Sequence, residues 1–256
     1  MTRRVGAGLA LALAGLSAAG CFFLPYPYNE TDSARRLLPP CAAHPLGTDH
    51  LGRDILSRVM AGGRATLLVA LVTVAGSAAA GALLGLGAGL AGGLADEVIM
   101  RAMDCIAAFP GVLAALLVVS LAGNSLPCLT AALCVLFTPG FTRIFRSGML
   151  QYRGADFVSA ARVQGAGPLR IMFRHILPNL SPQVLAASVL GLSNAILAES
   201  AMSYLGLGVQ PPVPSWGRML AESQGYLLAA PWCALAPGAC IVLAVLSFHL
   251  MGVGGE

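Results

Sequence analysis

The feature that most constrains this chain is a series of uncharged apolar runs, each about as long as a bilayer core is thick. A membrane-spanning helix needs about 20 such residues. The chain is 57% hydrophobic and only 10% charged over its 256 residues, whereas soluble domains are about 25% charged. The runs lie at residues 5–24, 65–95, 106–122, 127–142, 176–198 and 226–248. The pattern predicts an all-α polytopic membrane protein with about six transmembrane helices, the third and fourth forming a hairpin at the turn-rich cluster 123–127.

Every positive charge of the chain is an arginine, and the arginines are unevenly placed. No lysine occurs among the 15 basic residues, which excludes a standard phosphate-binding loop on this chain. Six arginines fall between residues 143 and 174, where Asp156 is the one acidic residue. The positive-inside rule then places this segment in the cytoplasm, with both chain termini on the same side.

Other interpretations stay open at this point. Arg3 and Arg4 before an apolar run are also compatible with a signal peptide cleaved near Cys21. A secondary transporter or channel would also consist of membrane helices, but such carriers usually place ionisable groups at mid-membrane. The ionisable residues here sit at the edges of the runs, at Asp104, His175, Glu199 and His249. No HExxH motif or CxxC pair occurs, so neither an intramembrane enzyme nor a metal site is indicated.

The arginine-rich segment has the pattern of two short helices joined by glycines. Residues 155–164 can form the first helix, which Gly165 and Gly167 end, and Pro168 suits the first turn of the second. Apolar faces are expected at Phe157, Ala160, Ala161 and Gln164 in the first helix, and at Leu169, Met172, Phe173 and Ile176 in the second. Such a unit fits an interfacial helix held by anionic lipid, a solvated loop, or a docking element for a partner protein.

This segment resembles the EAA motif of permease subunits in ATP-binding-cassette importers. Ser159 stands where that motif commonly has glutamate, and His175 where it commonly has isoleucine. The resemblance implies a loop that couples the permease to an ATPase. Its positions in this chain are Ser159, Ala160, Ala161, Gly165, Gly167, Leu177 and Pro178.

A second resemblance lies at residues 45–58, which are similar to the LGTDxLGRDxxSR stretch of C-type subunits of dipeptide, oligopeptide and nickel permeases. Its positions are Gly47, Thr48, Asp49, Gly52, Arg53, Asp54 and Arg58. The residues themselves predict an amphipathic outer helix that Thr48 or Asp49 caps, with an apolar stripe of Leu51, Ile55, Leu56, Val59 and Met60. Residues 92–110 and 204–217 also resemble family segments, and the first of these implies an inner loop with Asp96, Arg101 and Asp104.

Together these resemblances imply a type I importer permease fold, with residues 1–44 as an N-terminal helix and outer loop and residues 45–256 as the permease core. They imply a heterodimer with a second permease subunit, two ATPase subunits that bind ATP and magnesium, and an extracytoplasmic binding protein. No cofactor, catalytic residue, metal or nucleic-acid partner is expected on this chain. The expected location is the bacterial inner membrane. Dipeptides, oligopeptides and nickel all remain possible substrates, with peptides slightly favoured.

Overall fold

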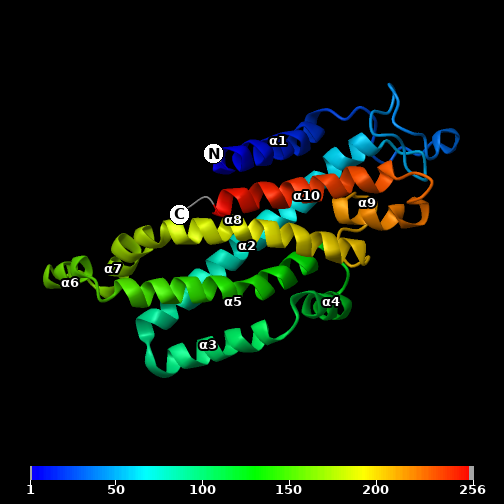
Figure 1. Ribbon diagram of the computed structural model, residues 1–256. Coiled ribbons are helices and arrows are strands. Elements are labelled where there is room, and N and C mark those ends of the chain that lie inside the picture. Colours follow the sequence, from blue (N-terminus) through cyan, green and yellow to red (C-terminus); the bar gives the residue numbers. More distant parts are fainter. Residues whose placement is uncertain (1, 254–256) are drawn as a thin grey trace.

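The protein is a bundle of long helices (Figure 1), and the computed structural model describes residues 2–253. Five helices are long and apolar enough to cross a bilayer. They are α1 (Thr2–Phe22), α2 (Ile55–Ala91), α5 (Leu126–Tyr152), α8 (Leu177–Tyr204) and α10 (Trp232–Val253). Two more helices, α3 (Gly93–Ala108) and α4 (Gly111–Ala122), form a sixth, broken crossing. The prediction of an all-α protein with about six spans is confirmed.

Helix α2 is the centre of the bundle and contacts α1, α5 and α8, while α10 lies between α1 and α8 (Figure 1). Small residues allow the closest of these approaches. A Cβ on Gly81 of α2 would lie 2.8 Å from the backbone nitrogen of Thr142 on α5. Helices in a bilayer pack through such close backbone contacts, because lipid supplies no hydrophobic drive for their association.

The third crossing differs from the straight span predicted at residues 106–122. Helix α3 ends at Ala108, and α4 leaves it at an angle of 90°. Pro110 lacks a backbone donor and disfavours helical geometry in the residue before it, and Phe109 is accordingly extended, with φ −82° and ψ 137°. The predicted span is therefore wrong in shape, although the chain does break and cross in this region.

Other boundaries also move. Helix α2 begins at Ile55, so the predicted outer amphipathic helix and the second span are one continuous helix of 37 residues. Helix α10 begins at Trp232, after Pro231, whereas the sixth run was placed from residue 226. Residues Gln224–Tyr226 form a separate 3-10 turn, η3.

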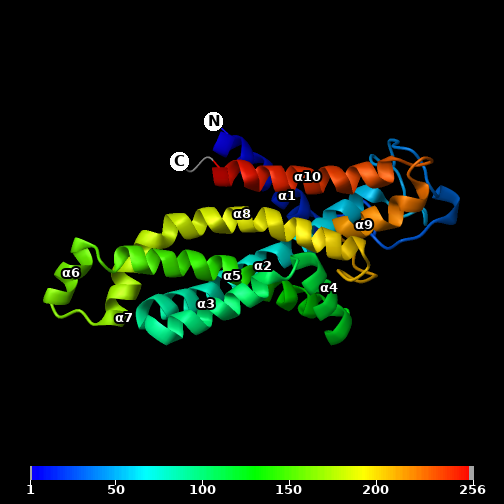
Figure 2. The same ribbon diagram turned by 60° about the horizontal axis from the view of Figure 1, so that its bottom comes forward.

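The two ends of the bundle are built differently (Figures 1 and 2). One end carries the break between α2 and α3, the N-terminal end of α1, the C-terminal end of α10, and the short helices α6 (Asp156–Val163) and α7 (Pro168–Ile171). The opposite end carries residues 23–54, with the 3-10 turn η1 (Ser33–Arg35), and α9 (Trp216–Ser223). The division at residues 44 and 45 stays a prediction.

Candidate functional site

The segment from residue 155 to residue 178, here called the elbow, projects beyond the ends of the neighbouring helices (Figures 1 and 2). Helices α6 and α7 are joined at Gly165, whose φ is +82°. Left-handed backbone of this kind favours glycine because a Cβ would be strained there. The predicted helix–glycine–helix shape is confirmed, including the start of the second helix at Pro168.

The inner face of the elbow is not the face that the sequence pattern predicted for α6. Val158 and Ala161 are the buried residues of α6, and they belong to the same core cluster as Ile171 and Ile176. Phe157 is 40% exposed instead, and Ala160 and Gln164 are exposed as well. Of the predicted face only Ala161 points inward, because an eight-residue helix gives too few turns to fix its rotation by period alone.

The second helix of the elbow differs from the prediction in its geometry, because it is not α-helical throughout. Residues Met172–Ile176 form a turn of π-helix, η2, between α7 and α8. Pro178 lies just beyond it, and the proline ring would clash with a carbonyl in a regular α-helix, so a widened turn accommodates it. Of the predicted apolar face, Met172 and Ile176 are buried as predicted, whereas Leu169 and Phe173 are each 59% exposed and Ile171 is buried instead.

The outer face of the elbow is therefore apolar where it meets solvent. Val163 is 90% exposed, next to the exposed Leu169 and Phe173. Ser159, Ala160 and Gly167, three of the predicted coupling positions, are also exposed there. Of the remaining coupling positions, Gly165 and Pro178 are exposed, and Leu177 is half-buried. Most of the predicted coupling residues are thus exposed on the elbow, whereas Ala161 is buried in the core.

The arginines around the elbow separate into two groups. Arg143 and Arg146 of α5 pair with α3, through Arg143 Nη2 to Asp104 Oδ1 at 2.7 Å and Arg146 Nη2 to Asp96 Oδ2 at 2.6 Å. Within residues 2–253, no ion pair involves the other arginines of the segment, which are Arg153, Arg162, Arg170 and Arg174. The first group fastens α3 to α5. In the second, Arg153 Nη1 donates to the carbonyl of Gly89 at 3.5 Å and Arg162 Nη2 donates to the carbonyl of Arg153 at 3.4 Å.

The predicted inner-loop residues lie on a helix rather than in a loop. Asp96, Arg101 and Asp104 are all part of α3. Arg101 pairs with Glu97 at 2.6 Å, one turn away on the exposed side. Asp96 and Asp104 instead face α5, where they pair with Arg146 and Arg143.

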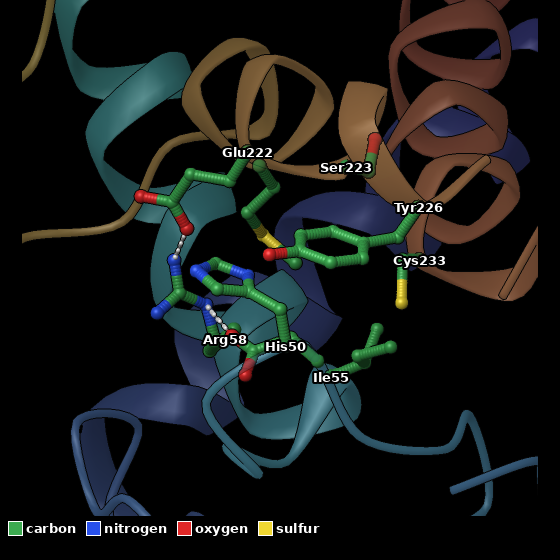
Figure 3. A pocket seen from close by; sticks show the side chains of 9 residues that line it. His50, Ile55, Arg58, Glu222, Ser223, Tyr226 and Cys233 are labelled. Carbon is green, nitrogen blue, oxygen red and sulfur yellow. Dashed lines mark hydrogen bonds and ion pairs between the residues drawn. The ribbon is translucent and has the colours of Figure 1, made fainter. Parts of the chain in front are cut away.

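At the opposite end, residues 47–58 pack against α9 and η3 in what we call the outer cap. Its centre is a set of charges around Arg58, whose side chain is 3% exposed. Arg58 Nη2 donates to Glu222 Oε2 at 2.8 Å (Figure 3). Arg53 Nη2 donates to the same oxygen at 2.8 Å. Asp49 accepts from the Nε of Arg53 at 2.6 Å and from the backbone nitrogens of Leu51 and Arg53.

Asp54, and not Thr48 or Asp49, caps helix α2. Its Oδ2 accepts from the backbone nitrogen and the hydroxyl of Ser57, both at 2.8 Å, and its Oδ1 meets His44 Nδ1 at 2.9 Å. Thr48 instead ties the preceding loop together through Arg35 and Leu38. The cap prediction was wrong because the helix starts four residues later than the sequence pattern allowed.

Glycine is needed in the outer cap for space as well as for conformation. Gly47 has a φ of +78°, and a Cβ there would lie 2.6 Å from the carbonyl oxygen of Leu38. Gly52 has a φ of +79°. Leu51, which the sequence placed in the apolar stripe, precedes the helix and is 40% exposed, whereas Ile55, Val59 and Met60 are buried.

His50 closes the outer cap over Arg58. Its ring stacks on Tyr226 with 5.2 Å between centroids and 9° between planes (Figure 3). Burial lowers the pKa of His50 below its ordinary value, and Asp49 opposes that effect. The cavity enclosed here measures about 10 Å³, enough for about one water molecule. The outer cap is therefore too tightly packed to hold a peptide-sized substrate.

Sequence reasoning missed one buried acid near the outer cap. Glu199 lies at an edge of the span, as expected, but it is fully buried. Its Oε1 accepts from Ser203 Oγ at 2.6 Å, and that hydroxyl accepts from the backbone nitrogen of Val209 at 3.0 Å. The apolar period of α8 gave no signal for this, because the residues that bury Glu199 belong to other segments. In the described part of the chain, no group of three potential metal ligands comes together.

The fold and its two ends define a class: a polytopic helical membrane protein with a projecting elbow at one end and a closed cap at the other. Residues 81–253 match the family described as binding-protein-dependent transport system inner membrane component. The chain belongs to this family. It is a permease subunit of a transport system, and the alternative of a secondary transporter or channel is overturned by this match.

Individual relatives extend the similarity to almost the whole chain. A dipeptide transport system permease protein, DppC, from Haemophilus influenzae is 38% identical over 98% of this chain and 87% of its own length. The DppC protein of Alkalihalophilus pseudofirmus is 41% identical over 89% of this chain and 75% of its own length. A glutathione transport system permease protein, GsiD, from Pectobacterium atrosepticum is 37% identical, covering 98% and 84%.

Proposed function

We propose that this chain is the C-type permease subunit of an ATP-driven, binding-protein-dependent importer of dipeptides or short oligopeptides in a bacterial inner membrane. The names of its relatives support a peptide substrate: two are dipeptide permeases, and the third transports glutathione, which is itself a tripeptide. Nickel, the other substrate considered from the sequence, has no support among these relatives. The chain would bind no ATP itself, since ATP and magnesium would sit on partner ATPase subunits.

One observation carries the coupling role: the elbow exposes Val163, Leu169 and Phe173 at the end of the bundle. Apolar side chains grouped on a projecting surface mark a protein contact. A lipid-bound helix would not need the Gly165 bend, and a solvated loop would not need the apolar face. Arg162, Arg170 and Arg174 of the same segment are exposed and form no ion pair within residues 2–253, so they suit a partner with acidic residues.

The elbow is joined rigidly to the transmembrane helices. Residues Pro168–Tyr204 run as one 37-residue helical segment through η2 into α8. A movement that an ATPase imposes on α6 and α7 would therefore tilt α8 against its neighbours, which is a rigid-body way of switching access between the two sides. This assignment places the elbow and both termini in the cytoplasm and the outer cap toward the binding protein.

The test is reconstitution of the complete importer in vesicles, with uptake of a radiolabelled dipeptide and co-purification of the ATPase as readouts. Val163→Asp in the elbow is expected to reduce both by at least 10-fold while the permease pair stays assembled. Leu228→Asp is the matched control, because Leu228 is fully exposed at the opposite end and should leave ATPase binding unchanged. Normal ATPase binding by the Val163 variant would contradict the coupling role.

A further inference from the structure

Helix α8 carries three side-chain amides, of which Asn179 in the first turn donates to the carbonyl of His175 at 2.5 Å. The other two, further inside the span, lie on one face of α8. Gln183 and Asn194 are both exposed. They are 11 residues apart, which is about three helical turns and about 16 Å along the axis, so both project from the same side. The other crossing helices contain no asparagine or glutamine except Gln151, in the last turn of α5. We call Gln183 and Asn194 the amide stripe.

Neither amide is used inside the chain. Among the hydrogen bonds formed within residues 2–253, none involves the side chain of Gln183 or Asn194, whereas nearby serines are satisfied. The hydroxyl of Ser188 donates to the carbonyl of Val184 at 2.7 Å, and that of Ser193 donates to Val245 on α10 at 3.2 Å. Each amide thus keeps its donors and its acceptor free and directed away from the bundle.

A free amide facing lipid would be costly, because hydrocarbon supplies neither donors nor acceptors. The exposed face of α2 shows what the chain presents where lipid is suitable. After Arg64 every exposed residue of α2 is apolar or glycine: Leu68, Leu71, Val72, Ala75, Ala79, Leu83, Gly87, Leu90 and Ala91. Two unpaired amides therefore argue that the side of α8 that carries them, together with the exposed Leu197, faces surroundings more polar than lipid.

We propose that the amide stripe lines the water-filled path shared with the second permease subunit and hydrogen-bonds the backbone of the peptide that passes. This proposal rests on the function proposed above. A side-chain amide carries a donor and an acceptor in the same geometry as a peptide group, so it binds any peptide backbone regardless of sequence. Ala187 and Ala201 lie on the same side of α8 and leave room beside the amides.

The first experiment measures water access at matched depth. A Cβ on Gly191 of α8 would lie 3.4 Å from a methyl group of Val74 on α2, so these two residues share a level in the bilayer. The helices are antiparallel, and three residues toward the outer cap the corresponding positions are Asn194 and Leu71. Leu71 is 57% exposed on the apolar face of α2 and is the control.

Asn194→Cys, Gln183→Cys and Leu71→Cys would each be made in a chain whose seven native cysteines are replaced. The complete importer carrying each variant is treated with a hydrophilic, membrane-impermeant thiol reagent, with and without ATP plus vanadate. Only a hydrated thiol ionises and reacts. We expect positions 194 and 183 to react at least 10-fold faster than position 71 in at least one of the two conditions. Equal, slow reaction at all three positions in both conditions overturns the proposal.

A second readout separates a path-lining role from a structural one. Asn194→Leu has a similar size and no hydrogen-bonding groups, and we expect it to reduce dipeptide uptake at least 10-fold at normal abundance. Asn194→Gln should restore at least a third of the lost uptake. If Asn194 faced lipid, Asn194→Leu would keep full uptake or raise abundance, which refutes the proposal. Absence of dipeptide uptake by the unsubstituted importer would instead refute the proposed function.

Discussion

The outer cap and the elbow are both rich in arginine, yet they use it in opposite ways. In the outer cap, Arg53 and Arg58 share the carboxylate of Glu222, and Asp49 completes the set. In the elbow, Arg162, Arg170 and Arg174 are exposed and find no carboxylate within the described residues. The charged side chains of the outer cap pair with one another and hold the cap together. Those of the elbow form no ion pair in the part of the chain that the structure describes.

The difference shows that two equally distinctive sequence segments can have unrelated roles. The outer segment 45–58 is a structural closure, because its polar atoms are already paired and its cavity admits about one water molecule. The elbow, under the function proposed above, is a contact surface for the ATPase. Substitutions should therefore affect stability at one end and transport at the other.

The largest effect is expected for the same substitution made at both ends. Arg58→Gln leaves Glu222 partly unpaired in a buried site and should cost about 3 kcal/mol of stability. Arg170→Gln, on the exposed elbow, should cost less than about 1 kcal/mol. Thermal denaturation of the two purified variants provides the measurement. Equal losses at the two positions would erase the distinction between a closed cap and an open elbow.

Neighbouring alanines in α6 give the next contrast. Ala161 is 6% exposed, so Ala161→Trp should overpack the elbow and destabilise it by about 1–3 kcal/mol. Ala160 is exposed, so Ala160→Trp should preserve abundance and stability while lowering uptake by obstructing the contact surface. Abundance by immunoblot and uptake in the same cells distinguish the two. Full uptake by an abundant Ala160→Trp protein would argue against docking at this surface.

Smaller effects are expected where α5 is fastened to α3. The Arg146–Asp96 pair is partly shielded, with side chains 31% and 18% exposed, and Arg146→Gln should cost about 1 kcal/mol. The Arg143–Asp104 pair is more open, at 51% and 63%, and Arg143→Gln should cost less than about 0.5 kcal/mol. A reversed order in denaturation experiments would mean that solvent exposure does not govern these pairs.

The smallest effect concerns pH at the outer cap. Because burial lowers the pKa of His50, the unfolded chain binds a proton more readily than the folded chain. The contribution of neutral His50 is thus complete above the ordinary histidine pKa of about 6.5 and is lost as the pH falls through the lowered folded pKa. His50→Phe keeps a ring against Tyr226 without titrating. The drop in melting temperature from pH 7.5 to 5.5 should be smaller in this variant than in the wild type.

Much of the fold could be read from the sequence, and the exceptions have physical causes. Uncharged runs located the crossings because lipid excludes charge along a whole span. The bend at Phe109–Pro110 was missed because the run continues unbroken across it, although proline marks the position. The length of α2 was missed because Arg58 and Arg64 interrupt the apolar run without interrupting the helix.

The elbow and the outer cap were also predicted only in part. The elbow was found because glycine, proline and arginine are local signals. Its inward face was predicted correctly at Ala161, Met172 and Ile176. The rest was missed because α6 is only eight residues long and because a π turn at Met172–Ile176 departs from the regular helical period. Glu222 was not recognised as the partner of Arg53 and Arg58 because these arginines lie more than 160 residues away in the chain. Long-range pairing of this kind leaves no trace in a single sequence.

The continuity of α7, η2 and α8 has a consequence for distance. A segment of 37 residues spans about 55 Å at helical rise, which exceeds the thickness of the hydrocarbon core. Pivoting this rod near its middle sends its two tips in opposite directions. A push received at Leu169 on one side of the membrane would then displace Tyr204 on the other side without any hinge in between.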